Sequence, residues 1–105
     1  MASLIVISWR AIPAQVVVKR GRETAKVQLS ARFQEAIDRA AMRAGKGSSD
    51  AYLADWQRSD PRPCSDDLHA EARAEAERLE SRYTDDALEQ MIRNKGNALP
   101  TGTNS

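Results

Sequence analysis

A single cysteine and a single histidine are the residues of this chain whose types could support covalent or metal chemistry. Cys64 follows Arg62 and precedes a predicted helix N-terminus, a positively charged setting that lowers the pKa of a thiol. The carboxylates of Asp66 and Asp67 would raise that pKa again. For a metal site, His69 and one cysteine cannot complete a usual set of zinc ligands without distant carboxylates. We therefore expect an ordinary loop cysteine, no metal site and no cofactor.

The glycines and carboxylates of the sequence show no catalytic pattern. The five glycines match neither the dinucleotide-binding spacing nor the P-loop spacing. Neighbouring carboxylates stand at predicted helix starts, where the helix dipole accounts for them, so general acid–base catalysis has no distinctive pair. We expect that the protein is not an enzyme.

A basic patch is predicted at the tip of a hairpin. Lys19, Arg20 and Arg22 surround Gly21, and Lys26 follows on the exposed face of the next strand. Such a cluster could contact the phosphates of a nucleic acid. No aromatic residue is interleaved with it to stack on bases, so a solvated hairpin is the simpler interpretation and nucleic-acid binding is the alternative.

The aromatic residues are predicted to be mostly core residues. Tyr52 and Trp56 fall, with Leu53, on one side of a short predicted helix. If that helix lies at the edge of the fold, Trp56 becomes an exposed anchor of the kind that dominates protein interfaces. Trp56 and Tyr52 are therefore the predicted protein-contact residues.

The strands that must position these residues are predicted within the first 29 residues, and helix patterns occupy nearly all of the rest. The apolar run 4–7, which ends at Trp9, predicts the most buried strand, apolar on both faces. Pro13 interrupts the pattern, which resumes at 15–19, and alternation over 25–29 predicts a third strand. The predicted fold class is α+β, with a small three-stranded antiparallel N-terminal sheet packed by three to four helices.

The first helix is the most clearly patterned. It begins after Ser30 and ends at Gly45, and Phe33, Ile37 and Ala41 recur at spacings that turn them toward the sheet.

Three further helices are predicted from caps and spacing. A short helix after residue 50 ends before residue 60, and the proline-containing segment 58–64 is predicted to be loop. A long helix with a narrow apolar stripe follows the cap at 65–67, and the chain restarts a helix at Thr84 that stops near Gly96.

Length and composition predict one cytoplasmic domain, residues 1–96 of the 105. Residues 1–58 hold the sheet and first helices, residues 65–96 form an acidic helical extension, and the small, polar residues 97–105 are predicted to be disordered. The net charge of +1, the short apolar runs and the single cysteine predict no membrane association and a reducing, cytoplasmic location.

Charge is segregated along the chain. The first 46 residues hold nine basic and three acidic side chains, whereas residues 66–89 hold nine acidic and three basic ones. One interpretation is that the acidic helix folds back over the basic half, or that both are solvated faces. The other is that one half is a partner-binding surface.

Residues 9–56 resemble a small bacterial domain family described as virulence factor, which occurs alone or attached to larger conserved virulence proteins. The resemblance rests on WRAIPAQV at 9–16, KVQL at 26–29 with RFQEAIDRAAM at 32–42, and SDAYLADW at 49–56. Ser30 stands where the family favours proline, and both residues suit a helix start. The resemblance implies no established enzymatic activity and carries over no catalytic residue. It does imply an association with folate-linked and corrinoid-dependent methyl-transfer enzymes, near which stand-alone members are encoded.

Together these observations predict a non-enzymatic bacterial accessory module that acts through protein contacts, with one-carbon enzymes among the partners that the resemblance implies. A small core and alanine-rich helices leave apolar surface, which predicts a homodimer or a complex with a larger cytosolic protein. One alternative is a nucleic-acid-binding protein that uses the basic hairpin at residues 19–22. Another is an accessory subunit that touches the substrate or cofactor of a one-carbon enzyme.

Overall fold

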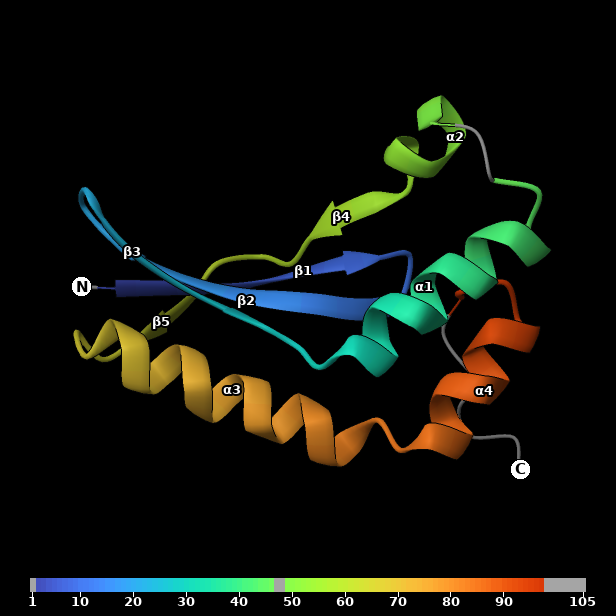
Figure 1. Ribbon diagram of the computed structural model, residues 1–105. Helices are drawn as coiled ribbons and strands as arrows, with labels where there is room; N and C mark the ends of the chain where they lie inside the picture. The colour runs from blue at the N-terminus through green and yellow to red at the C-terminus, as the bar shows by residue number, and fades with distance from the viewer. Residues whose placement is uncertain (1, 47–48, 98–105) are drawn as a thin grey trace.

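In the computed structural model, which describes residues 2–46 and 49–97, an antiparallel sheet forms one layer and helices pack against one of its faces (Figure 1). The strands are β1 (Ala2–Trp9), β2 (Ile12–Arg20), β3 (Glu23–Gln28), β4 (Trp56–Arg58) and β5 (Arg62–Cys64). Their order is β3-β2-β1-β4, and β5 also pairs with β1. The α+β class with an antiparallel sheet is confirmed, and the three predicted N-terminal strands are present, but the sheet has five strands rather than three.

The two additional strands lie where a loop and the end of a short helix were predicted: β5 and Arg58 fall in the predicted loop 58–64, and Trp56 and Gln57 of β4 fall in the predicted short helix. β4 pairs with the end of β1 at Ile7–Trp9, and β5 pairs with its start at Ala2–Leu4. Each has three residues, too few for an alternating pattern to be visible in the sequence. Pro63 is tolerated because β5 is an edge strand, where a missing N–H costs no ladder hydrogen bond.

β1 is buried or partly buried along its whole length, with Ala2, Leu4, Ile5 and Trp9 buried and no residue exposed, in line with the prediction. β2 is buried to a similar degree, at Ile12, Pro13, Val16, Val17 and Val18, but its last two residues are exposed. β2 begins at Ile12 and includes Pro13, and the β1–β2 register shifts between Ile7 and Ser8, so that Ala14 of β2 has no ladder partner. β2 also lies between β1 and β3 and against the long helix, which explains its burial.

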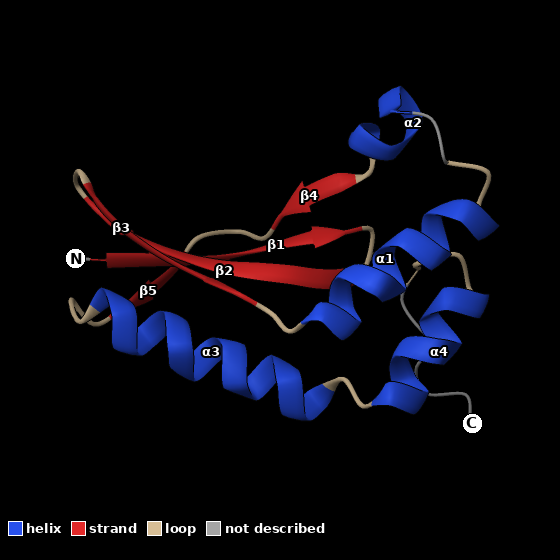
Figure 2. Cartoon of the chain, viewed as in Figure 1, coloured by secondary structure: helices blue, strands red, loops and turns tan. Residues whose placement is uncertain are grey.

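Four helices are present in the described residues, within the predicted three to four. They are α1 (Ala31–Arg43), α2 (Ser49–Ala54), α3 (Leu68–Arg82) and α4 (Asp85–Arg93). α3 runs lengthwise beneath β2 and β3, whereas α1 packs on α4 and on the end of β2 (Figures 1 and 2). α2 alone rises above the level of the sheet (Figure 2). Within the described part of the chain, no helix is long and apolar enough to span a bilayer.

The ends of these helices are set by local residues. The Thr84 hydroxyl accepts a hydrogen bond from the backbone N–H of Ala87 at 3.1 Å and caps α4, as predicted. Gly45 and Gly96 follow α1 and α4 with positive φ angles of 73° and 87°. The predicted disorder of residues 97–105 falls mostly on 98–105, which lie outside the described residues.

The core lies between the lower face of the sheet and α1, α3 and α4. The side chains of Phe33 and Ile37 are fully buried, which confirms their predicted position. α3 contributes Ala72, Ala76 and Leu79, the thin stripe predicted from its sequence. Ile5 and Val17 are buried as well, but they lie outside this cluster, because they point to the opposite face of the sheet.

Candidate functional site

Three aromatic side chains form a row from the core to the surface beside α2. The Trp9 ring is fully buried and stacks on Tyr52, with ring centroids 5.9 Å apart. Tyr52 in turn meets Trp56 edge to face at 5.8 Å. The indole Nε1 of Trp9 donates a hydrogen bond to the Tyr52 carbonyl oxygen at 2.8 Å, which ties α2 to the end of β1.

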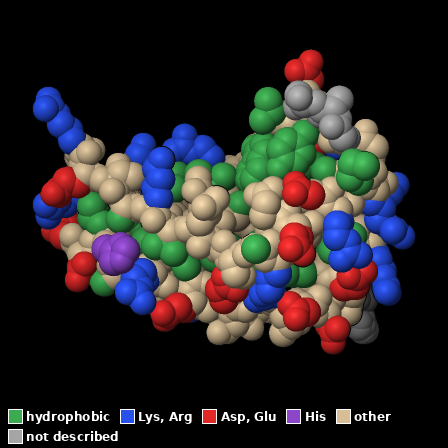
Figure 3. Space-filling model, in the orientation of Figure 1, with side chains coloured by type: hydrophobic (Ala, Val, Ile, Leu, Met, Phe, Trp, Pro, Cys, Tyr) green, Lys and Arg blue, Asp and Glu red, His purple; other side chains and the backbone are tan. Residues whose placement is uncertain are grey.

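Trp56 does not lie on the short helix as predicted but begins β4, directly opposite Trp9 of β1. Both Tyr52 and Trp56 are half-buried, and the side chain that projects into solvent is Leu53, which is 62% exposed. We call Tyr52, Leu53 and Trp56 the α2 patch. Figure 3 shows hydrophobic side chains gathered at this end of the molecule. Leu53 was missed as a contact residue because six residues of helix are too few to separate a buried side from an exposed one.

The Arg10 side chain also fixes the position of α2 and of the α2 patch. Its guanidinium lies 5.0 Å from the Trp9 ring centroid, and its Nε donates to the Asp55 carboxylate at 3.2 Å. Its Nη1 also donates to the Lys95 carbonyl oxygen at 2.8 Å. One side chain therefore joins the β1–β2 turn, the end of α2 and the end of α4, and the patch rests on a rigid base.

The structure does not bring the predicted basic patch together as one cluster. Arg20 turns toward the helix side, where it pairs with Glu23 at 2.7 Å and with Asp66 at 3.5 Å. Lys19 and Lys26 point to the opposite face, because residues two apart on a strand share a face and neighbours do not.

A different basic group arises on that opposite face of the sheet. Lys26 is paired across the ladder with Val17, Lys19 with Ser3, and Arg58 of β4 with Ile7. All three cations are exposed and have no ion pair in the described residues. The alternation of β2 and β3 could have placed Lys19 and Lys26 on one face, but only the pairing of β4 adds Arg58.

Cys64 lies on β5 opposite Ala2 and is half-buried against the core. Burial raises the pKa of its thiol, Glu71 raises it further, and the lowering by Arg62 is smaller than either effect. Arg62 is turned instead toward Glu75, at 3.0 Å. In the residues that the structure describes, no three His, Cys, Asp or Glu side chains are grouped to hold a metal ion.

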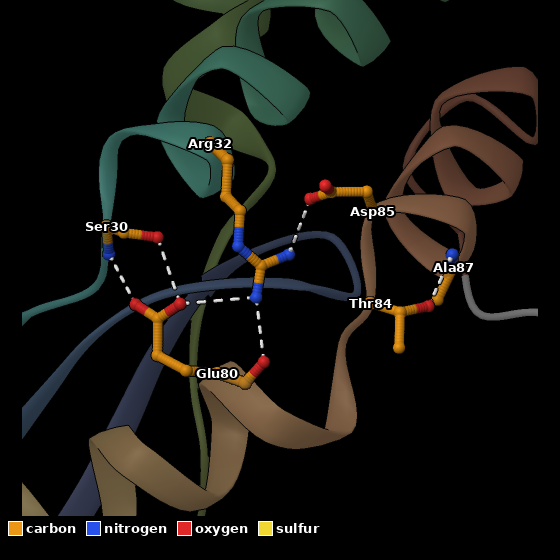
Figure 4. A network of polar contacts seen from close by, with 6 residues as sticks. All are labelled: Ser30, Arg32, Glu80, Thr84, Asp85 and Ala87. Carbon is orange, nitrogen blue, oxygen red and sulfur yellow. Dashed lines mark hydrogen bonds and ion pairs between the residues drawn. The ribbon is translucent and has the colours of Figure 1, made fainter.

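The segregated charges meet where the start of α1 touches the end of α3 (Figure 4). The Glu80 carboxylate accepts hydrogen bonds from the Ser30 backbone N–H at 2.6 Å and the Ser30 hydroxyl at 2.9 Å, and Arg32 donates to it at 3.2 Å. Arg32 also donates to the Asp85 carboxylate at 3.3 Å. Burial alone would raise the pKa of Glu80, but the bonds from Ser30 and Arg32 outweigh it and hold that pKa below its usual value.

Further pairs join the same two halves of the chain. Arg39 of α1 pairs with Glu89 of α4 at 3.2 Å, and the Arg20 contact to Asp66 ties the hairpin to the start of α3. The acidic helical region therefore folds back over the basic half, as one of the two interpretations predicted. These ion pairs neutralise part of the charge of both halves, and the basic group on the open sheet face is among the cations that have no ion pair in the described residues.

The geometry defines a small α+β domain whose aromatic row and charged groups are arranged at its surface. The chain belongs to the family described as virulence factor, whose model matches residues 7–92. The match extends past residue 56, so α3 and most of α4 are part of the family domain, beyond the portion in which the sequence motifs were recognised. Membership associates the chain with virulence and specifies no reaction. No curated protein and no solved structure matches the chain significantly.

Proposed function

We propose that this protein is a non-enzymatic accessory module that acts through contacts with another protein. The observation that carries the proposal is the α2 patch, in which Leu53 is 62% exposed on a base fixed by the Trp9 stack and by Arg10. Because the contacts of Trp9 and Arg10 tie α2 to the rest of the fold, little backbone ordering is needed when a partner covers Leu53. The half-buried Trp56 beside it is of the residue type that most often anchors interfaces.

The test is affinity capture from the native cytoplasm by the tagged chain, with captured proteins quantified by mass spectrometry. Leu53→Asp places a charge in the α2 patch and should reduce capture of the partner at least ten-fold. Met42→Asp is the matched control, because Met42 is the other large exposed apolar side chain, 72% exposed, and lies on α1 outside the patch. Enzymes of folate- and corrinoid-dependent methyl transfer are the first candidates to look for.

Two results would contradict the proposal. One is equal loss of the partner with Leu53→Asp and with Met42→Asp, since the α2 patch would then have no particular role. The other is a chain that stays monomeric in sedimentation at about 100 μM, above the range of ordinary specific complexes, and that also captures no protein.

A further inference from the structure

The sheet has one face without a helix, and this open face has a defined chemistry. α3 and α1 pack on the other side, whereas the upper face in Figure 1 carries no packed helix along β1, β2 and β3. Ile5 and Val17 lie at its centre, directly opposite each other in the β1–β2 ladder. They are 6% and 3% exposed, so little of their surface is in contact with water.

Cations stand around this apolar centre. Lys26 on β3, Lys19 on β2 and Arg58 on β4 occupy positions of the same face, and the long stems of such residues cover apolar surface while their charged ends stay in water. No carboxylate occupies a ladder position on this face. Asp60 follows β4 in the sequence, but it lies in the connection between β4 and β5 and is not part of the ladder. Lys and Arg side chains line the upper edge of the sheet in Figure 3.

The opposite face shows how this sheet accommodates a helix. The small side chains of Ala72 and Ala76 let α3 approach the strands closely. Carboxylates from this part of the chain then pair with arginines on opposite sides of the sheet, Glu75 with Arg62 of β5 and Asp66 with Arg20 of β2. The open face repeats this arrangement, with an aliphatic centre and cations on β3 and β4, but here the cations are unpaired among the described residues.

The open face is also continuous with the α2 patch. Trp56 and Arg58 are two residues apart on β4 and therefore share a side of that strand. α2 rises above the sheet next to β4 (Figure 1), and hydrophobic side chains gather at that end of the molecule (Figure 3). The basic group of the open face therefore borders the α2 patch.

We propose that the open face, defined by Lys19, Lys26 and Arg58 around Ile5 and Val17, binds an acidic amphipathic helix of a partner protein. The carboxylates of that helix pair with the three cations, and its apolar residues contact the α2 patch. This inference rests on the proposed function and specifies the partner's chemistry.

Two other occupants fit the open face less well. A second copy of the chain offers no matching acidic surface, because its carboxylates either pair within the molecule or are spread over the four helices, their N-caps and the β4–β5 connection. Single-stranded nucleic acid binds sheet faces through exposed aromatic rings on which bases stack, and the β1, β2 and β3 ladder positions of this face carry none. Trp56 of β4 is half-buried and packs edge to face on Tyr52.

The test uses the full chain and a fluorescein-labelled 18-residue peptide designed as an amphipathic helix, with glutamate on one side and leucine on the other. Fluorescence anisotropy should show binding that weakens as salt increases. A peptide with glutamine in place of glutamate should bind at least ten-fold more weakly. The triple variant Lys19→Glu, Lys26→Glu, Arg58→Glu should lose the acidic peptide by at least the same factor.

The matched control reverses three other exposed cations that have no ion pair among the described residues, in the variant Arg43→Glu, Arg73→Glu, Arg82→Glu. It has the same net charge as the open-face variant and should bind the acidic peptide within two-fold of the unaltered chain. If the open-face variant fails to fold, judged by its circular dichroism spectrum, Lys26→Gln with Arg58→Gln replaces it and should weaken binding in the same direction.

Several outcomes would overturn the inference. One is that the two triple variants weaken binding of the acidic peptide equally, and another is that the acidic and glutamine peptides bind equally well. The inference also fails if the chain binds no peptide up to about 1 mM, or if it binds a 20-nucleotide oligo-dT more tightly than the acidic peptide through the same three cations. The capture experiment separates this failure from failure of the proposed function. If the open-face variant still retains a partner that Leu53→Asp loses, the protein is an interaction module and the open face is not its acidic-helix site.

Discussion

Gly96 at the end of α4 is the position where one methyl group should have the largest effect. Its φ angle is 87°, and a Cβ added there would stand 2.7 Å from Cζ3 and 3.1 Å from Cε3 of Trp9. The Trp9 ring cannot easily move aside, because it is fully buried, stacks on Tyr52 and donates a hydrogen bond to the Tyr52 carbonyl oxygen. Gly96→Ala should therefore strain the backbone and displace the aromatic row at the same time.

Gly45 provides the control for the backbone part of this effect. Its φ angle is 73°, but a Cβ added there meets no atom within 4 Å. A left-handed conformation costs an alanine roughly 1–2 kcal/mol at either position. Overpacking a core adds roughly 1–3 kcal/mol, and only Gly96 incurs it. We expect Gly96→Ala to lower the free energy of unfolding by about 2–5 kcal/mol and Gly45→Ala by about 1–2 kcal/mol.

The assay is urea-induced unfolding followed by far-ultraviolet circular dichroism, which does not depend on the environment of Trp9 itself. The unfolding free energy is extrapolated linearly to water for each variant. Because Trp9 supports Tyr52, Gly96→Ala should also weaken partner capture through the α2 patch. Stabilities of the two variants that agree within about 0.5 kcal/mol would refute the close packing of Trp9 on Gly96.

Three further predictions concern the core, the thiol and the charged contacts. Ile37→Ala should cost about 2–5 kcal/mol in urea unfolding, because its fully buried side chain leaves a cavity, and a loss below about 0.5 kcal/mol would contradict its core position. Cys64→Ser should leave fold and partner capture unchanged, and iodoacetamide should alkylate Cys64 more slowly in the folded chain than in urea at pH 7, since burial raises its pKa. Glu80→Gln should destabilise the chain at pH 7. The folded-state pKa of Glu80 is depressed, so its stabilising effect is present above the unfolded value of about 4.3 and is lost as the pH falls through the folded value, and the two unfolding free energies should then converge. A pH-independent difference would show that Glu80 acts through packing instead.

Several features of the fold follow from the sequence because they depend on neighbours in the chain. Alternation along a strand, spacing along a helix and capping residues are local properties, and they correctly indicate the α+β class, the core side of α1 and the starts of α3 and α4. The return of the acidic region over the basic half was one of two interpretations, because charge segregation is compatible with folding back and with a free surface alike.

What the tertiary structure decides depends on residues far apart in the chain. β4 and β5 form because the edge of β1 offers unpaired backbone groups, and three-residue strands have no pattern of their own. The same pairing sets Trp56 opposite Trp9 and Arg58 beside Ile7, so it defines both the α2 patch and the third cation of the open face. The sequence by itself determines which residues are apolar or charged and which alternate. Which of those charges are neutralised, and which remain free to meet a partner, is decided only when distant segments pack, because ion pairing depends on distance in space rather than along the chain.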